Sequence, residues 1–334
     1  MLRHRPPETA SAGSWMVVGA GGMLGHAVLD RLSQGGHTAV GLGRRILDIT
    51  EASAVWQAMA THRPTVVVNC AAWTAVDDAE AHEEEALLVN GRGPAHLGAA
   101  CAASGARLLH VSTDYVFSGE ADTPYTEDHE PDPRTAYGRG KLAGERAVLG
   151  LLPHTGYVIR TGWLYGAGGG NFVRTIIRME RSKSTLDVVD DQRGQPTWAA
   201  DLADLLVSLG NAAVLGTAPA GVFHGTSSGE ATWFELARET FRLLGADPTR
   251  VRPANSGSHP RPARRPAYSV LGHHRLASAG LQPIRPWRDA LTEALPELVA
   301  AERGVPPQKL DGPTHDVRGP GAAGVKEGGP VSDP

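Results

Sequence analysis

Trp15-Met-Val-Val-Gly-Ala-Gly-Gly-Met-Leu-Gly25 is the stretch that decides the fold of this 334-residue chain. Its first four residues are apolar and predict a short buried strand, while the residues after the glycines have helical spacing. The pattern Gly19-x-x-Gly22-x-x-Gly25 therefore lies in a strand-to-helix turn, where glycines allow the backbone to approach a phosphate closely. The helix would also present free N–H groups and its positive dipole end to an anion. The alternative is a glycine-rich turn without a ligand, because the chain has 41 glycines.

Strands are predicted to alternate with helices through the first half of the chain. The predicted strands are 15–19, 38–42, 65–69, 107–111 and 157–160, and the predicted helices include 55–60, 142–149 and 79–103, the last interrupted near Gly91. This alternation predicts an α/β fold with a Rossmann-type, doubly wound parallel sheet and a smaller C-terminal substrate-binding lobe.

The expected domain organisation follows from this pattern and from composition. We expect a nucleotide-binding domain over residues 14–165, with a return segment near 199–222, and a mainly substrate-binding lobe over 166–303. Residues 1–13 and the Gly- and Pro-rich residues 304–334 are predicted to be a disordered leader and a disordered tail.

Composition excludes several classes of function. The net charge is −4 with no basic stripe, which argues against nucleic-acid binding. The chain has no apolar run of the ~18 residues that span a bilayer. Its two cysteines, Cys70 and Cys101, are not in a metal-ligand or disulfide pattern, so we expect no metal site, reduced thiols and a cytoplasmic location.

The segment after the second predicted strand bears on the choice of cofactor. An acidic residue there would hydrogen-bond the ribose of NAD, whereas this chain has Arg44 and Arg45, which favour the 2′-phosphate of NADPH. NADH stays open, because the two arginines can also be a solvated surface pair. Further on, the small residues Ala71 and Ala72 end a strand and leave room for the nicotinamide-side ribose.

A second group of residues carries the chemistry. Ser112-Thr113-Asp114 ends the strand at 107–111, and Tyr137 is followed four residues later by Lys141, which places both on one helix face. The lysine charge is expected to lower the tyrosine pKa, so that Tyr137 can pass a proton to a carbonyl oxygen while a hydride reaches the carbon. Thr113 would hydrogen-bond and polarise the same oxygen.

The motifs resemble the extended short-chain dehydrogenase/reductase superfamily and, within it, the dTDP-4-dehydrorhamnose reductase family. The resemblance runs from about residue 15 to residue 295 and rests on the stretches 68–77, 110–117, 137–145, 159–166, 170–173, 191–197 and 265–271. His110-Val-Ser-Thr-Asp-Tyr-Val-Phe117 and Asp191-Gln-Arg-Gly-Gln-Pro-Thr197 are more specific than the Tyr-x-x-x-Lys pattern.

The resemblance implies roles at the matching positions. It assigns catalysis to Thr113, Tyr137 and Lys141, and contact with the substrate sugar to Thr113, Asp114 and Trp163. The expected cofactor site comprises Gly19, Gly22, Met23, Leu24, Gly25, Arg44, Asp48, Ile49, Ala71, Ala72, Trp73, Tyr137 and Lys141. Asp114 can accept from a sugar hydroxyl, and Trp163 is expected to offer a flat apolar face to a deoxysugar. Trp73 and Trp163 have the alternative of being core aromatics.

The chain departs from the family at three places. Some members hold magnesium between subunits through an acidic residue in the first helix, but this chain has Ala27 there, so neither the metal nor that dimer is expected. Gly162 stands where members often have serine, and the two ends of the chain have no counterpart in the family.

The implied activity is reduction of the 4-keto group of a dTDP-4-dehydro-6-deoxysugar with NADPH, giving dTDP-L-rhamnose. Arg261, Arg264 and Arg265 would contact the diphosphate of this small-molecule partner, and a homodimer is possible. Two alternatives remain: a reductase for another nucleotide deoxysugar, such as a dihydrostreptose precursor in antibiotic biosynthesis, and a non-catalytic regulatory subunit like that of methionine adenosyltransferase.

Overall fold

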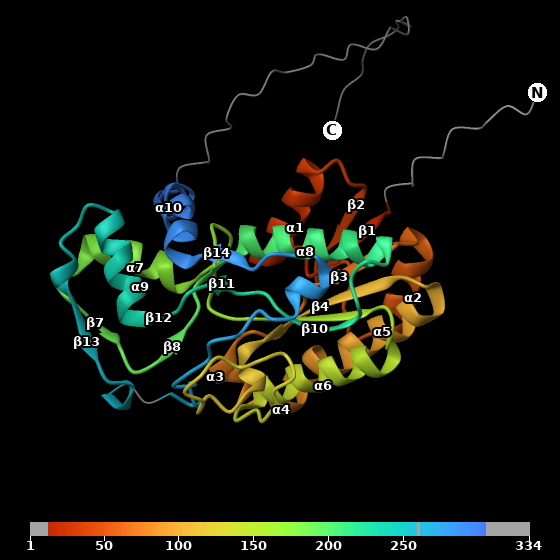
Figure 1. Ribbon diagram of the computed structural model, residues 1–334, viewed down its shortest axis with the longest axis horizontal. Helices are drawn as coiled ribbons and strands as arrows, with labels where there is room; N and C mark the ends of the chain where they lie inside the picture. The colour runs from red at the N-terminus through yellow and green to blue at the C-terminus, as the bar shows by residue number, and fades with distance from the viewer. Residues whose placement is uncertain (1–12, 259–260, 305–334) are drawn as a thin grey trace, which may run out of the picture.

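Six parallel strands form the main sheet of the protein. The computed structural model describes residues 13–258 and 261–304, and its sheet has the order β10-β5-β4-β3-β1-β2 (Figure 1). The strands are β1 (Trp15–Val18), β2 (Ala39–Leu42), β3 (Val66–Asn69), β4 (Arg107–Thr113), β5 (Gly156–Thr161) and β10 (Gly221–His224). The predicted α/β class with a Rossmann-type parallel sheet is confirmed.

Helices cover both faces of this sheet, because side chains alternate along each buried strand. On β1, Trp15 and Val17 belong to the apolar core shared with α1 (Met23–Gln34) and α8 (Ala199–Leu215). Met16 and Val18 face the opposite core, which includes residues of α2 (Ala52–His62), α5 (Gly93–Ser104) and α6 (Ala136–Leu151). Figure 1 shows α1 and α8 above the sheet and α5 and α6 below it.

Late segments of the chain return to this sheet. Helix α8 lies against α1, and β10 pairs in parallel with β5. The helix comes so close that a Cβ at Gly210 would lie 2.2 Å from the Trp15 ring. Leu276 and Ile284 pack in the same core. The predicted domain boundaries stay a prediction, and residues 1–12 and 305–334 of the expected leader and tail lie outside the described residues.

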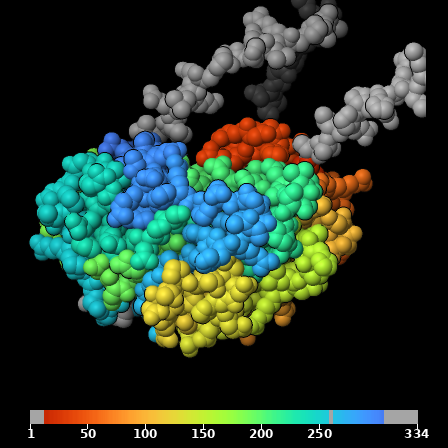
Figure 2. Space-filling model, viewed as in Figure 1, coloured from red at the N-terminus to blue at the C-terminus, as the bar shows by residue number. Residues whose placement is uncertain are grey.

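The smaller lobe is built around two more apolar cores. Its main elements are α7 (Phe172–Ser182), β7 (Leu186–Val189), α9 (Trp233–Leu243), β13 (Val251–Ala254) and α10 (Trp287–Arg303). Short strand pairs join it: β6 (Leu164–Tyr165) with β9 (Thr197–Trp198), β8 (Arg193–Gly194) with β12 (Ala231–Thr232), and β11 (Ser227–Ser228) with β14 (Ile284–Pro286). In the space-filling view, cyan and blue segments form the left side and also reach the centre (Figure 2).

The helical stretch predicted at 79–103 contains several elements in the structure. After α3 (Val76–Ala79) come α4 (Glu83–Leu87), a π-helical segment η1 (Leu88–Arg92) and α5. The expected interruption near Gly91 is thus a widened turn, a kind that is often found at functional sites. In the part of the chain that the structure describes, no helix is both long and apolar enough to cross a membrane.

Candidate active site

The glycine turn between β1 and α1 is packed on one side. Gly19 has a φ of +77°, and a Cβ there would lie 2.5 Å from the Ala71 backbone nitrogen. A Cβ at Gly25 would lie 2.4 Å from the Gly19 carbonyl oxygen. Both positions therefore need glycine: the first because of its left-handed backbone and the closeness of β3, the second because the helix begins directly over the turn.

The opposite side of the turn fits the phosphates of a dinucleotide. A Cβ at Gly21 would meet nothing within 4 Å, and Gly22 begins α1 without a side-chain cap. The first N–H groups of the helix are therefore free to bind an anion. Met23 lies at this helix start, and Leu24 is buried in the core beneath it.

The residues that follow β2 differ in how far their side chains are exposed to solvent. Arg44 and Arg45 are exposed, and Gly43 lies beside the turn, its Cβ position 3.8 Å from the Gly21 nitrogen. Asp48 accepts from the Thr50 backbone N–H at 2.9 Å and hydroxyl at 2.7 Å, and these bonds lower its pKa. Ile49 is buried. Arg44 and Arg45, in contrast, present exposed positive charges at this end of the site.

A buried asparagine fixes the strand end at Ala71, Ala72 and Trp73. The Asn90 side chain accepts from the Trp73 N–H at 2.8 Å and donates to the Trp73 carbonyl at 3.0 Å. Asn90 lies in η1 and was not among the predicted site residues. Its signal in the sequence is a polar residue within a helical stretch, directly before Gly91. Trp73 is half-buried and packs with Tyr137.

Two elements bring the chemical residues together. Thr113 ends β4, and Thr135 caps α6 by accepting from the Gly138 N–H at 3.0 Å. A Cβ at Gly138 would lie 2.2 Å from the Tyr115 carbonyl oxygen, so the start of α6 is pressed against the end of β4. This contact places Tyr137 near Thr113 and Asp114, both of which influence its pKa.

The expected lowering of the Tyr137 pKa by Lys141 is not found. Burial raises the pKa of Tyr137 to about 12. The hydrogen bond with Thr113 lowers this pKa, and the negative charge of Asp114 raises it further. The ammonium group of Lys141 is directed at β4, where its Nζ donates to the Val111 carbonyl at 2.6 Å. Desolvation dominates because the tyrosine is enclosed, and Lys141 is not among the groups that shift its pKa. The protonated tyrosine is the form suited to donate a proton.

Asp114 has one oxygen bound and one without a partner. Its Oδ1 accepts from the Thr113 hydroxyl at 3.0 Å, while no protein group of the described residues hydrogen-bonds Oδ2. Burial raises the pKa of Asp114 to about 6, although the nearby Ser269 and Thr113 hydroxyls act to lower it. A Cβ at Gly162 would lie 2.7 Å from Oδ2, so a serine here would displace the carboxylate. Because its hydroxyl donates to Oδ1 of Asp114, Thr113 must turn away from Asp114 to polarise a substrate oxygen.

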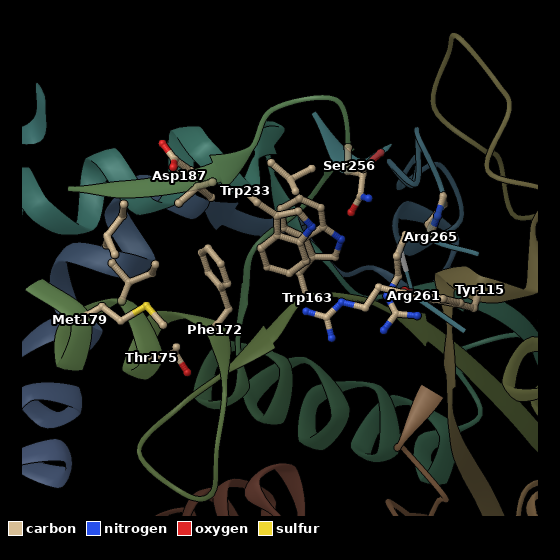
Figure 3. Close-up of a pocket in the computed structure, with 16 residues that line it drawn as sticks. Tyr115, Trp163, Phe172, Thr175, Met179, Asp187, Trp233, Ser256, Arg261 and Arg265 are labelled. Atoms are coloured by element: carbon tan, nitrogen blue, oxygen red, sulfur yellow. The ribbon is translucent and has the colours of Figure 1, made fainter. Parts of the chain in front are cut away.

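A cavity of about 520 Å³ is lined by Tyr115, which packs edge-on against Tyr137. Thr113, Asp114 and Tyr137 are not among its lining residues. Figure 3 shows its wall of stacked indoles, Trp163 and Trp233, with Phe172 and Met179 at one side and Arg261 and Arg265 at the other. It is lined by Tyr115, Trp163, Phe172, Thr175, Ile176, Met179, Leu186, Asp187, Val188, Val189, Gln192, Trp233, Ser256, Arg261, Arg265 and Pro266. The cavity has both an apolar part and a cationic part.

Trp163 lines the cavity, but Trp233 covers one face of its ring. Its ring stacks on Trp233 at a centroid distance of 3.5 Å and an angle of 3°. A Cβ at Gly194 would lie 2.4 Å from the same ring, close to the indole nitrogen, so the Gly194 backbone packs closely against it. Trp163 also has a φ of +51°, a strained value for an aromatic residue.

Comparison with known proteins decides the family. The model of the RmlD substrate binding domain matches residues 14–300. The chain belongs to the RmlD substrate binding domain family. It is 59% identical over 293 residues to the dTDP-4-dehydrorhamnose reductase of Streptomyces griseus, covering 87% of this chain and 96% of that one. The dTDP-4-keto-6-deoxy-D-glucose reductase of Streptomyces niveus is 52% identical over 288 residues, covering 86% and 98%.

A solved structure of the RmlD family carries a cofactor. The dTDP-4-dehydrorhamnose reductase of Bacillus anthracis, in complex with NADP, matches with a TM-score of 0.80 and 33% identity, covering 85% of this chain and 99% of that chain. These findings confirm the family that the motifs predicted.

Among the three arginines predicted to hold a diphosphate, this RmlD-family chain brings two to the cavity. Arg265 and Arg261 lie 2.8 Å and 3.5 Å from Oδ2 of Asp77, and Oδ1 of Asp77 accepts from the Ala263 N–H. Arg264 pairs with Glu120 at 2.7 Å and does not line the cavity. Asp77, Gly194 and Trp233 were not predicted as site residues, because their roles depend on contacts between segments far apart in the sequence.

Proposed function

We propose that this chain reduces the 4-keto group of a dTDP-4-dehydro-6-deoxysugar with NADPH, and that its main reaction converts dTDP-4-dehydrorhamnose to dTDP-L-rhamnose. The observation that carries the proposal is the meeting of Thr113, Asp114 and Tyr137, next to which Tyr115 lines a cavity with apolar and cationic walls. The relatives named as reductases of dTDP-4-ketosugars support it, as does the NADP-bound relative.

NADPH would supply a hydride to the ketone carbon when it is bound in the glycine turn. Tyr137, which burial keeps protonated in the neutral range, donates its phenolic proton to the ketone oxygen. Thr113 hydrogen-bonds the same oxygen after rotating from Asp114. The free Oδ2 of Asp114 accepts from a sugar hydroxyl, and Arg261 and Arg265 bind the diphosphate by charge-assisted hydrogen bonds.

The test of this function supplies dTDP-4-dehydro-6-deoxyglucose and NADPH with and without a 3,5-epimerase, and identifies the product by NMR. We expect dTDP-L-rhamnose only when the epimerase is present. The free sugar should be reduced with a lower kcat and a higher KM than the nucleotide sugar, because binding energy from the nucleotide supports the chemical step. Equal turnover of the free sugar would contradict the assignment of the cavity.

The first alternative is reduction of another nucleotide deoxysugar. It is favoured by the relative named for dTDP-4-keto-6-deoxy-D-glucose, and a reduced product formed without the epimerase would support it. A non-catalytic regulatory subunit is the second alternative. It would require that no nucleotide ketosugar is reduced, which the presence of Thr113, Tyr137 and Lys141 argues against.

The cofactor preference depends on Arg44. We expect the chain to have a lower KM for NADPH than for NADH, because Arg44 is exposed beside the turn and can pair with a 2′-phosphate. Arg44→Asp should raise the KM for NADPH by about tenfold or more, the cost of losing one charge-assisted contact, and lower the NADH:NADPH ratio of KM values. Initial rates with both cofactors measure this. Unchanged NADPH kinetics would contradict the role of Arg44.

We also propose a cytoplasmic location and pairing of two copies as a homodimer. The free thiols Cys70 and Cys101 support a reducing compartment. Two consecutive exposed apolar side chains, Leu87 and Leu88, support self-association.

A further inference from the structure

Asp77 is a charged residue that the proposed reaction does not yet use, although it contacts the cationic wall of the cavity. It lies on α3, which follows β3 of the main sheet, whereas its partners lie 184 to 188 residues later in the chain. Its Oδ2 accepts from Arg265 at 2.8 Å and from Arg261 at 3.5 Å, and its Oδ1 accepts from the Ala263 N–H at 3.2 Å. A single carboxylate therefore binds the segment 261–265 at three points.

The same segment is also fixed from another side. Arg264 donates to Glu120 at 2.7 Å and does not line the cavity. A Cβ at Gly119 would lie 2.4 Å from the Pro266 side chain, so the backbone that follows the arginines is packed against this loop. Loss of the charge on Asp77 should therefore release the side chains that it binds and leave the backbone of the segment in place.

Arg265 keeps donors for a ligand while it is bound to Asp77. Its Nη2 donates to Asp77, and its Nη1 donates to the Ala263 carbonyl at 3.1 Å. A guanidinium group has five N–H donors in one plane, so three remain beyond these contacts among the described residues. Because the two contacts fix the plane, they also fix the directions of the remaining donors. The Arg265 side chain is 23% exposed, against 63% for Arg261, and is thus the better ordered of the two.

The Asp77–Arg265 pair lies near the aromatic residues of the candidate active site. Figure 3 shows Arg261, Arg265 and Tyr115 at the same side of the cavity. Burial raises the pKa of Tyr115, the charge of Arg265 lowers it, and the charge of Asp77 raises it. Since Tyr115 also packs against Tyr137, the pair lies between the cavity and the chemical residues.

We propose that Asp77 is a positioning residue that orients Arg265, and to a smaller extent Arg261, to bind the diphosphate of the nucleotide sugar. An arginine that is already ordered loses less conformational entropy when the ligand binds. The ligand is that of the proposed function, on which the inference rests, but the role of Asp77 concerns binding and not hydride transfer.

A carboxylate beside a diphosphate could instead oppose binding, because like charges repel. The contacts of Asp77 favour positioning. Although burial acts to raise the pKa of Asp77, hydrogen bonds from Arg265 and Ala263 and the charges of Arg265 and Arg261 lower it. Its negative charge is thus balanced by two cations of the protein. The two effects have opposite signs, so a binding experiment separates them.

Isothermal titration calorimetry with dTDP measures the role of Asp77 without a ketosugar and without turnover. Asp77→Asn keeps an acceptor for the Ala263 N–H but loses the ion pairs. We expect its Kd for dTDP to rise about tenfold, which corresponds to about 1.4 kcal/mol. Tighter binding of dTDP would show that repulsion dominates and would overturn the proposal, as would an unchanged Kd.

Glu120→Gln is the matched control, because Glu120 binds the neighbouring Arg264 outside the cavity. Loss of this exposed pair should leave the Kd for dTDP within about twofold of the wild type. A loss as large as that of Asp77→Asn would mean that any break in this segment weakens binding, which contradicts a specific role for Asp77.

A double-mutant cycle with Arg265→Gln shows whether Asp77 acts through this arginine. In that background, Asp77→Asn should change the Kd for dTDP by no more than about threefold, because most of its effect requires Arg265. The full tenfold effect in that background, or a parallel loss of NADPH binding, would indicate a general structural defect and overturn the proposal.

The calorimetric result is distinguishable from failure of the proposed function. If the wild-type protein binds dTDP but reduces no ketosugar, the proposed function fails, while the affinities of the variants still decide the role of Asp77. If the wild-type protein does not bind dTDP, both proposals are overturned.

Discussion

Tyr137→Phe should lower kcat by about 100-fold or more while leaving NADPH affinity nearly unchanged, because it removes the proposed proton donor and little else. The phenolic group lies where burial raises its pKa to about 12, so the tyrosine stays protonated through the neutral range. The ring itself packs edge-on against Tyr115 at a centroid distance of 5.7 Å, a contact that phenylalanine preserves. Stopped-flow kinetics with excess ketosugar and NADPH would measure the change.

Tyr115→Phe is the matched control for this experiment. Tyr115 lines the cavity and touches Tyr137, yet its hydroxyl has no proposed part in proton transfer. It should retain turnover within about tenfold of the wild type, well short of the loss of a general acid. Equal losses in the two variants would mean that packing of the aromatic pair, and not proton donation by Tyr137, limits the rate.

Glu145→Gln should lower the free energy of unfolding by about 3–5 kcal/mol, because it leaves the charge of Arg160 buried without a counter-ion. Arg160 donates to the Glu145 carboxylate at 2.7 and 2.9 Å, and the two side chains are only 3% and 2% exposed. Urea denaturation followed by circular dichroism measures the change.

The exposed pair of Arg139 and Glu83 serves as the control. Their contact is equally short, 2.7 Å, but both side chains are nearly half exposed. Glu83→Gln should therefore cost no more than about 1 kcal/mol. If both glutamine variants lost the same stability, the burial of the Arg160–Glu145 pair would have no special energetic importance.

The fold could be predicted from sequence because its signals are local. Apolar runs such as Val66–Asn69 and the glycine turn at Gly19 depend on neighbours within a few residues, and their elements lie in the structure close to the predicted ranges. The helix start at Gly22 and the Tyr137–Lys141 spacing are local in the same sense.

The site was only partly predictable because its properties depend on long-range contacts. The stacking of Trp163 on Trp233 and the close packing of Gly194 against the same ring join three segments whose proximity no spacing reveals. The raised pKa of Tyr137 comes from enclosure by the fold, which a Tyr-x-x-x-Lys pattern does not encode. For the same reason, the sequence did not distinguish Arg264, which pairs with Glu120, from Arg265, which lines the cavity.

The return of late segments to the main sheet has a consequence for synthesis on the ribosome. Until β10 emerges, β5 is an edge strand with unpaired N–H and C=O groups, which can pair with other chains. Until α8 and Leu276–Ile284 follow, Tyr157 and Ile159 lack much of their apolar cover. The nascent chain therefore exposes β5 as an unpaired, aggregation-prone edge strand while more than 60 further residues are translated, from position 161 to position 224. Its need for chaperones should be greatest during that interval.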